Sequence, residues 1–214
     1  LRMLERLGII SDEVSPNLAE ALDWAAANGL KHVEIRTVDG KNALQLTDDE
    51  ARRVRREVER RGLFVSVLAS TLFKCALDPS RPVQAGDLFG QREMSAAEHL
   101  ESVRRAIELS DLLGTGYIRV FSFWLEEEPE RWLDDIADYL RKAAAMAEER
   151  GKTLLLENEY ACNTRYAEYT RRLADAVGSA HLQILWDPAN EEYAGRPSFP
   201  DGYRQVRGRV RHVH

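Results

Sequence analysis

The chain lacks the features of several protein classes. Its 214 residues include only two cysteines, Cys75 and Cys162, with no C-x-x-C pair, so we expect reduced thiols rather than a disulfide. No apolar run approaches the roughly 18 residues that cross a membrane, and the opening LRMLERLGIISDE contains no signal-peptide core. We therefore expect a cytoplasmic protein without membrane contact.

Clustered positive charge is also missing. The formal net charge is −6 and the isoelectric point about 5.5, which disfavours nucleic acid as the main partner. A small neutral or anionic ligand is compatible with this balance. With 44% hydrophobic and 31% charged residues, the composition is that of an ordinary globular protein, and we expect one domain over residues 1–214.

Short β-branched runs alternate with longer amphipathic ones. Apolar residues at helical spacing predict helices over 17–28, 47–61, 93–113, 128–150 and 164–177, and a short helical turn near 201–206. Thr47 followed by Glu50 has the pattern of a capping box, and Gly29, Gly62, Gly114 and Gly151 stand where helices should end. Strands are predicted at 7–11, 32–36, 63–69, 116–121, 153–158, 182–187 and 209–214.

Strict β/α alternation predicts parallel strands, either in a doubly wound sheet or in a closed (β/α)₈ TIM barrel. A nucleotide-binding doubly wound sheet needs a glycine-rich turn after its first strand, where this chain has SDEVSPN. The α/β barrel is therefore favoured. The sequence supplies about seven of the eight strands and stops within the strand GRVRHVH, so we expect the last β/α units to lie beyond it.

Polar residues stand at three successive strand ends. Glu157 ends the fifth predicted strand, Asp187 the sixth and His214 the seventh, and barrel enzymes carry their chemistry at these ends. Two carboxylates and an imidazole suit a divalent cation such as Mn²⁺, Mg²⁺, Co²⁺ or Zn²⁺. The alternative for each residue is that it faces water or caps the next helix, and Asp187 before Pro188 has the pattern of a loop opening.

Further polar residues belong to the same predicted ring of strand ends. Glu34 and Arg36 share one face of the second strand and either pair with each other or bind a polar ligand. Arg119 and Glu159 join this candidate ring, unless they face solvent or form salt bridges to helices. His212 shares the face of His214 and is expected to pack and hydrogen-bond behind it.

A long segment separates the third and fourth predicted strands. Residues 72–92 are rich in proline, glycine and charge, and a loop of this length in a compact domain is usually functional or mobile. We interpret it as a lid over the site, with Trp124 as part of an apolar wall. An ordinary surface loop and core aromatic residues are the alternative.

Several stretches resemble the xylose-isomerase-like TIM barrels, specifically the sugar phosphate isomerase/epimerase family. They are VEIRTVDGKNALQLTDDE at 33–50, GYIRVFSFW at 116–124, LLLENEYACNT at 154–164, WDPANEEYAG at 186–195 and PDGYRQVRGRVRHVH at 200–214. The resemblance implies that Glu157, Asp187 and His214 hold a divalent metal, most commonly Mn²⁺. The family's fourth ligand, a glutamate on the eighth strand, has no counterpart in this sequence.

The resemblance also implies an activity. Such enzymes are metal-dependent sugar, sugar phosphate or sugar acid isomerases or epimerases, in which a metal-bound glutamate, here Glu157, abstracts a proton beside a carbonyl through a metal-stabilised enediolate. Family ketose epimerases have a histidine where this chain has Asn190, which leaves the substrate open. The residues expected to contact a small sugar-derived substrate are Glu34, Arg36, Arg119, Trp124, Glu159, Asn190 and His212.

Other functions fit the same sequence. A metal-dependent dehydratase of the inosose or dehydroshikimate type would use the same first step, and a non-catalytic sugar-binding relative would use the same pocket. A relative that cuts DNA at abasic sites is disfavoured, because it gathers three metals with many histidines and this acidic chain has five. A homo-oligomer is compatible with the resemblance, and the sequence identifies no interface.

Overall fold

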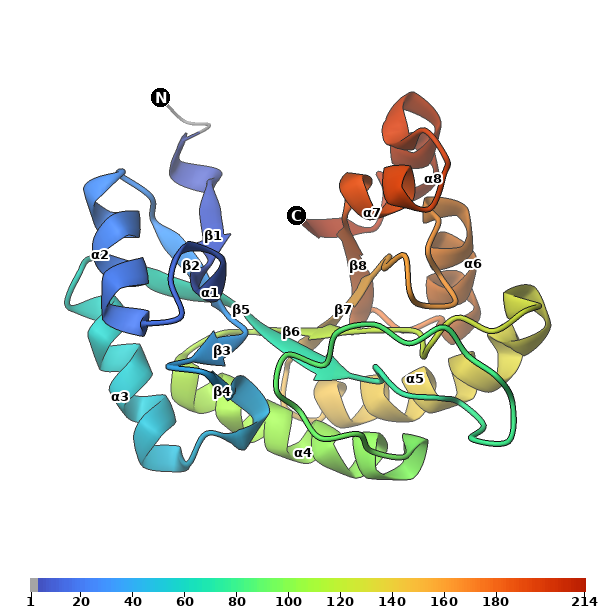
Figure 1. The fold of residues 1–214 in the computed structure, drawn as a ribbon, viewed down its shortest axis with the longest axis horizontal. Helices are drawn as coiled ribbons and strands as arrows, with labels where there is room; N and C mark the ends of the chain where they lie inside the picture. Colours follow the sequence, from blue (N-terminus) through green and yellow to red (C-terminus); the bar gives the residue numbers. More distant parts are fainter. Residues whose placement is uncertain (1–3) are drawn as a thin grey trace. The chain divides into compact units, whose positions relative to one another are not determined.

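The computed structural model describes residues 4–214 as an α/β fold (Figure 1). Seven strands form one sheet in the order β1-β2-β5-β6-β7-β8-β9, and the pairs β1–β2, β2–β5, β7–β8 and β8–β9 are parallel. The strands are β1 (Gly8–Ile10), β2 (His32–Ile35), β5 (Phe64–Leu72), β6 (Tyr117–Val120), β7 (Thr153–Glu157), β8 (Leu182–Trp186) and β9 (Val210–Val213). Two further strands, β3 (Thr37–Val38) and β4 (Lys41–Asn42), form an antiparallel hairpin.

Helices follow the strands in regular alternation. The α-helices are α1 (Ser11–Val14), α2 (Leu18–Ala27), α3 (Asp48–Glu59), α4 (Ala96–Leu113), α5 (Leu133–Glu148), α6 (Ala167–Val177), α7 (Pro188–Tyr193) and α8 (Tyr203–Val206). Short helical turns are η1 (Leu4–Arg6), η2 (Ala43–Gln45), η3 (Pro129–Trp132) and η4 (Ser198–Gly202). No helix in this described part of the chain has the length and apolar character needed to cross a membrane.

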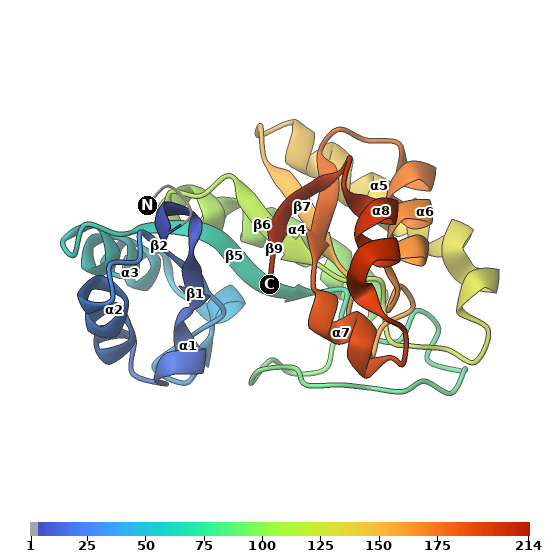
Figure 2. The same ribbon diagram turned by 90° about the horizontal axis from the view of Figure 1, so that it is seen from above.

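The chain divides into two compact units. One runs to Ser70 and adds Phe89–Gln91 and Arg104–Ile118; the other comprises Thr71–Leu88, Arg92–Val103 and Arg119–His214. In the first, the buried face of α3 presents Ala51, Val54 and Val58 to the core. In the second, α6 packs on β8 and on α8, and α8 lies beside α6 in Figure 2. Ala167, Ala174, Ile184, Trp186 and Val206 form a hydrophobic cluster there.

The predicted strands and the main helices are present, with shifted ends. The capping box of α3 is confirmed, since Thr47 Oγ1 accepts from the Glu50 amide and Glu50 Oε2 accepts from the Thr47 amide. Gly29, Gly62, Gly114 and Gly151 all have the positive φ of helix-terminating glycines. The predicted helix start at 164 is wrong, because the amide and hydroxyl of Thr164 bind the Ser122 hydroxyl, and α6 begins at Ala167.

Several short elements were not predicted. Asp187 and Pro188 open α7 rather than a loop, since the Asp187 carboxylate accepts from the Asn190 amide and proline occupies the first turn. The hairpin β3–β4 turns at Asp39 and Gly40, both with positive φ. Helix α1 has only four residues, which is too short for a periodic pattern.

The segment after β5 is the long loop predicted from the sequence, since the described chain has no helix or named strand between Leu72 and Ala96. The amides of Phe121, Phe123 and Trp124 donate to the carbonyls of Leu72, Phe73 and Cys75. Gln84 then pairs with Leu125 in an isolated bridge. These backbone contacts join residues 72–75 and Gln84 to the chain that follows β6. Cys75 and Cys162, both in this unit, are buried and free.

Candidate metal centre

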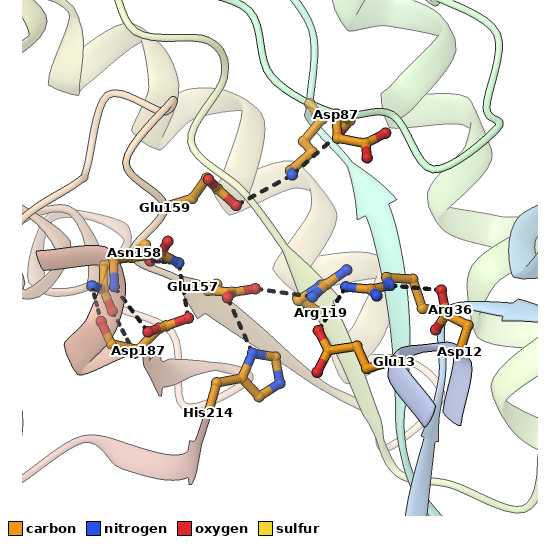
Figure 3. Close-up of polar contacts among 12 residues, drawn as sticks. Asp12, Glu13, Arg36, Asp87, Arg119, Glu157, Asn158, Glu159, Asp187 and His214 are labelled. Atoms are coloured by element: carbon orange, nitrogen blue, oxygen red, sulfur yellow. Dashed lines mark hydrogen bonds and ion pairs between the residues drawn. The ribbon is translucent and has the colours of Figure 1, made fainter. Parts of the chain in front are cut away.

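Three neighbouring strands bring two carboxylates and one imidazole together. Glu157 is the last residue of β7, Asp187 directly follows β8, and His214 directly follows β9. One ligand atom from each lies within 4.8 Å of the other two (Figure 3). The residues singled out from the strand ends of the sequence are thus the residues that converge.

Glu157 is buried and charged. Its Oε1 lies 3.1 Å from His214 Nδ1, and its Oε2 lies 3.2 Å from an Arg119 nitrogen, with both Glu157 and Arg119 side chains 3% exposed. Burial alone would raise the pKa of this carboxyl, yet the adjacent His214 and Arg119 lower it to about 2. Glu157 therefore stays ionised at neutral pH, as a metal ligand must.

Asp187 is held by Asn190. Its Oδ1 accepts from the Asn190 amide at 3.0 Å and its Oδ2 accepts from Asn190 Nδ2 at 2.9 Å. Burial raises the pKa of Asp187, and the negative charge of Glu157 raises it further. Glu157 and Asp187 are thus two buried carboxylates whose negative charges repel each other. A bound cation would offset this repulsion.

The donor set fits a divalent cation. An ion held at about 2.0–2.3 Å keeps its ligand atoms within roughly 4.5 Å of one another, which the convergence of these three side chains allows. Glu157 Oε2 is buried and makes an ion pair but no hydrogen bond in the described chain, so it retains lone pairs for a ligand. Asp187 also caps α7, which was the alternative role considered for it, while it lies close to Glu157 and His214.

A buried lysine near these residues was not anticipated from the sequence. Lys74 follows β5, is 2% exposed, and its Nζ lies 3.2 Å from Glu159 Oε2 and 3.3 Å from the Asp87 carbonyl. It also lies 4.5 Å from the centre of the Phe121 ring. Its positive charge contributes to lowering the pKa of Glu157, so it belongs to the same electrostatic environment. A charged residue shortly after an apolar strand was the only sequence feature that could have marked it.

The remaining predicted residues of this unit occupy defined places. Arg119 pairs with Glu157, and Glu159 pairs with Lys74 rather than with solvent. Trp124 is 1% exposed and packs in a hydrophobic cluster with Phe121, Ala161 and Cys162, which corresponds to the core aromatic of the alternative interpretation. The His212 and His214 rings lie edge to face, 5.7 Å apart.

Glu34 and Arg36 belong to the other compact unit. Glu34 lies on β2 with 4% exposure. The guanidinium of Arg36 lies 3.0 Å from Asp12 Oδ2 and 3.3 Å from Glu13 Oε1, and it stacks on the Phe89 ring. Arg36 is therefore already neutralised by carboxylates of α1 that the sequence had not singled out.

Comparison with known proteins identifies the family. The sequence model of the xylose isomerase-like TIM barrel family matches residues 22–214, and the chain belongs to that family. The predicted barrel fold is confirmed, because the chain is an α/β protein whose strands correspond to part of a TIM barrel. None of the curated protein sequences compared with the chain matches it significantly.

Solved structures agree on the fold. An L-ribulose 3-epimerase superposes with a TM-score of 0.71 at 19% identity, covering 98% of this chain and 69% of that one. The IOLI protein with a binding zinc atom gives 0.71 at 17%, covering 94% and 69%. The probable 3-DHS dehydratase AsbF of Bacillus anthracis gives 0.68 at 18%, covering 90% and 65%. This chain thus spans about two thirds of each of these proteins.

Proposed function

We propose that the chain carries the metal-binding part of a divalent-metal-dependent isomerase or epimerase acting on a sugar, sugar phosphate or sugar acid. The observation that carries this proposal is the convergence of Glu157, Asp187 and His214 at three neighbouring strand ends. The names of similar structures, an L-ribulose 3-epimerase and a zinc-containing IOLI protein, support the same class of substrate and cofactor. Mn²⁺ is the metal we assign, with Mg²⁺, Co²⁺ and Zn²⁺ as alternatives.

Glu157, Asp187 and His214 would hold the cation, and Arg119 would keep Glu157 ionised from the opposite side. A cation bound there supplies positive charge that stabilises the negative charge developing on a carbonyl oxygen during proton removal. We assign the proton transfer itself to Glu157. A positioned base usually contributes about 10²–10⁴ in rate, so polarisation of the substrate by the cation would supply much of the remaining acceleration.

The other predicted residues complete the proposed substrate site. Lys74 and Glu159 add a buried ion pair beside Glu157, and Asn190 and His212 support Asp187 and His214. Glu34 and Arg36 remain predicted substrate contacts, whereas Trp124 is 1% exposed in a hydrophobic cluster and is no longer proposed as one. We also propose that residues 1–214 act as one domain and that the protein is cytoplasmic. A homo-oligomer is part of the same proposal.

Solvent deuterium exchange tests this function. With Mn²⁺ and a panel of ketoses and sugar acids in deuterated water, the wild-type chain should place deuterium beside the carbonyl of one substrate. Glu157→Gln should reduce the rate by about 10²–10⁴-fold, the usual contribution of a positioned base. Glu168→Gln is the matched control, because Glu168 is half-exposed on α6 and outside the site.

A dehydratase is the second candidate, favoured by the fold similarity to the probable 3-DHS dehydratase AsbF. Both reactions begin with proton abstraction, and the mass of the product separates them, since loss of water identifies the dehydratase. Absence of deuterium incorporation and of water loss across the whole panel would contradict both.

A further inference from the structure

Asn158 links the backbones of the two residues that carry the carboxylates of the candidate metal centre. It directly follows Glu157 and is fully buried. Its side chain makes two hydrogen bonds to the backbone of Asp187, with Nδ2 donating to the carbonyl at 2.7 Å and Oδ1 accepting from the amide at 2.8 Å (Figure 3). One amide side chain therefore satisfies both polar backbone groups of the residue that carries the second carboxylate.

These two bonds continue the strand pairing past its end. The β7–β8 register runs from Leu154↔Leu182 to Glu157↔Leu185, and β8 ends at Trp186. The side chain of Asn158 then takes the place of the next backbone partner, so Asp187 stays fixed relative to Glu157 although regular pairing has stopped.

Asn190 connects Asn158 and Asp187 through a second set of hydrogen bonds. Its Nδ2 donates to the Asn158 carbonyl at 3.0 Å and to Asp187 Oδ2 at 2.9 Å. The backbone and the carboxylate of Asp187 are thus both anchored to the residue next to Glu157. Without that anchor, the repulsion between the two buried carboxylates would favour a larger distance between them.

We propose that Asn158 is a positioning residue that sets the spacing of Glu157 and Asp187 and thereby the affinity for the metal. This inference rests on the proposed metal site. Partners behind metal ligands typically change affinity by about 10–100-fold when they are removed.

Asn163 provides a matched control in the same unit. It is also fully buried, and its side chain also bonds two backbone groups, accepting from the Glu126 amide at 3.0 Å and donating to the Ser122 carbonyl at 3.0 Å. It bonds neither Glu157 nor Asp187 through these contacts. Removal of either asparagine costs a similar number of hydrogen bonds, but only Asn158 links the two ligands.

The experiment measures Mn²⁺ affinity by calorimetry in the 214-residue chain. Asn158→Ala should weaken binding by about 10–100-fold, while Asn163→Ala should change it less than about threefold although both lower the melting temperature. If Asn158→Ala does not fold, Asn158→Ser is measured instead, because its shorter side chain cannot reach both backbone groups of Asp187.

The outcomes separate this inference from the proposed function. Equal effects of the two alanine variants on affinity, or wild-type affinity in Asn158→Ala, would overturn the positioning role while leaving the metal site in place. A wild-type chain that binds no Mn²⁺ would overturn the metal site and the positioning role together.

Discussion

Glu157 and Asp187 are close in space but differ in their electrostatic surroundings. Glu157 has Arg119 and His214 against it, which outweigh burial and lower its pKa to about 2. Asp187 accepts hydrogen bonds from a neutral asparagine, and burial raises its pKa. His214 and the hydrogen bonds to Asp187 offset only part of the effect of its burial, so a cation would supply the compensation that remains.

His99 gives a pH-dependent prediction away from the metal centre. Its Nδ1 accepts from the amide of Phe73, a residue held at a φ of 65° just after β5. Burial lowers the pKa of His99 from 6.5 to about 4, against the opposing influence of Glu98. The unfolded chain then binds a proton that the folded chain excludes, so this contribution to stability is fully present above about pH 6.5 and is lost toward pH 4.

The variant His99→Asn keeps an acceptor for the Phe73 amide and removes the titrating ring. In urea unfolding between pH 7.5 and pH 4, the wild type should lose up to about 3 kcal/mol more than the variant. Parallel pH profiles for the two proteins would show that His99 is protonated as easily in the folded state as in the unfolded one.

At the scale of single residues, the sequence identified the three converging side chains but not their partners. Strand ends are readable because the strands are short, β-branched and evenly spaced, and their polar last residues stand out. Lys74 and Asn158 were missed, since their importance lies in contacts with Glu159 and Asp187 that no spacing rule reveals. Asn190 was singled out for the substrate, and the structure shows it bonded to Asp187.

The type of each main secondary-structure element was predicted better than the residues at which it begins and ends. Each predicted strand is present, and helix-ending glycines precede β2, β5, β6 and β7. Helix α7 was not predicted: the alternative interpretation of Asp187 before Pro188 was a loop opening, although an aspartate before a proline is also a helix start. A six-residue helix is too short for periodicity to decide between the two.

The β3–β4 hairpin allows a test of backbone strain. Gly40 has a φ of 82°, and a Cβ added there would meet no atom within 4 Å, so the cost of a side chain is conformational alone. Gly40→Ala should lower the free energy of unfolding by about 1–2 kcal/mol. Gly116 has equal space around it without a positive φ, and Gly116→Ala should be neutral or slightly stabilising. Equal effects in urea denaturation would contradict this explanation.

For the molecule as a whole, a ligand that binds only the folded state raises its stability. Mn²⁺ at a hundred times its dissociation constant should add about 2.7 kcal/mol, measured as an increase in melting temperature. Asp187→Asn should lose most of this increase, whereas Asp201→Asn, an exposed residue of η4, should keep it. An increase of the same size in both variants would indicate binding elsewhere.

Fold class was predictable from the sequence because β/α alternation predicted parallel strands and the missing glycine-rich turn favoured a barrel over a doubly wound sheet, and the family match over residues 22–214 agrees. The substrate was not predictable. Its determinants are side chains that bind particular hydroxyl or acid groups, and related barrels with similar folds include an epimerase and a probable dehydratase.

The central claim is that Glu157, Asp187 and His214 bind one divalent cation. A crystal of the 214-residue chain soaked in Mn²⁺ and measured at the manganese absorption edge tests it directly. We predict one strong anomalous peak at about 2.0–2.3 Å from an oxygen of each carboxylate and a nitrogen of His214. A fully soaked crystal with no peak among these three side chains, or with peaks only on surface carboxylates, would contradict the account.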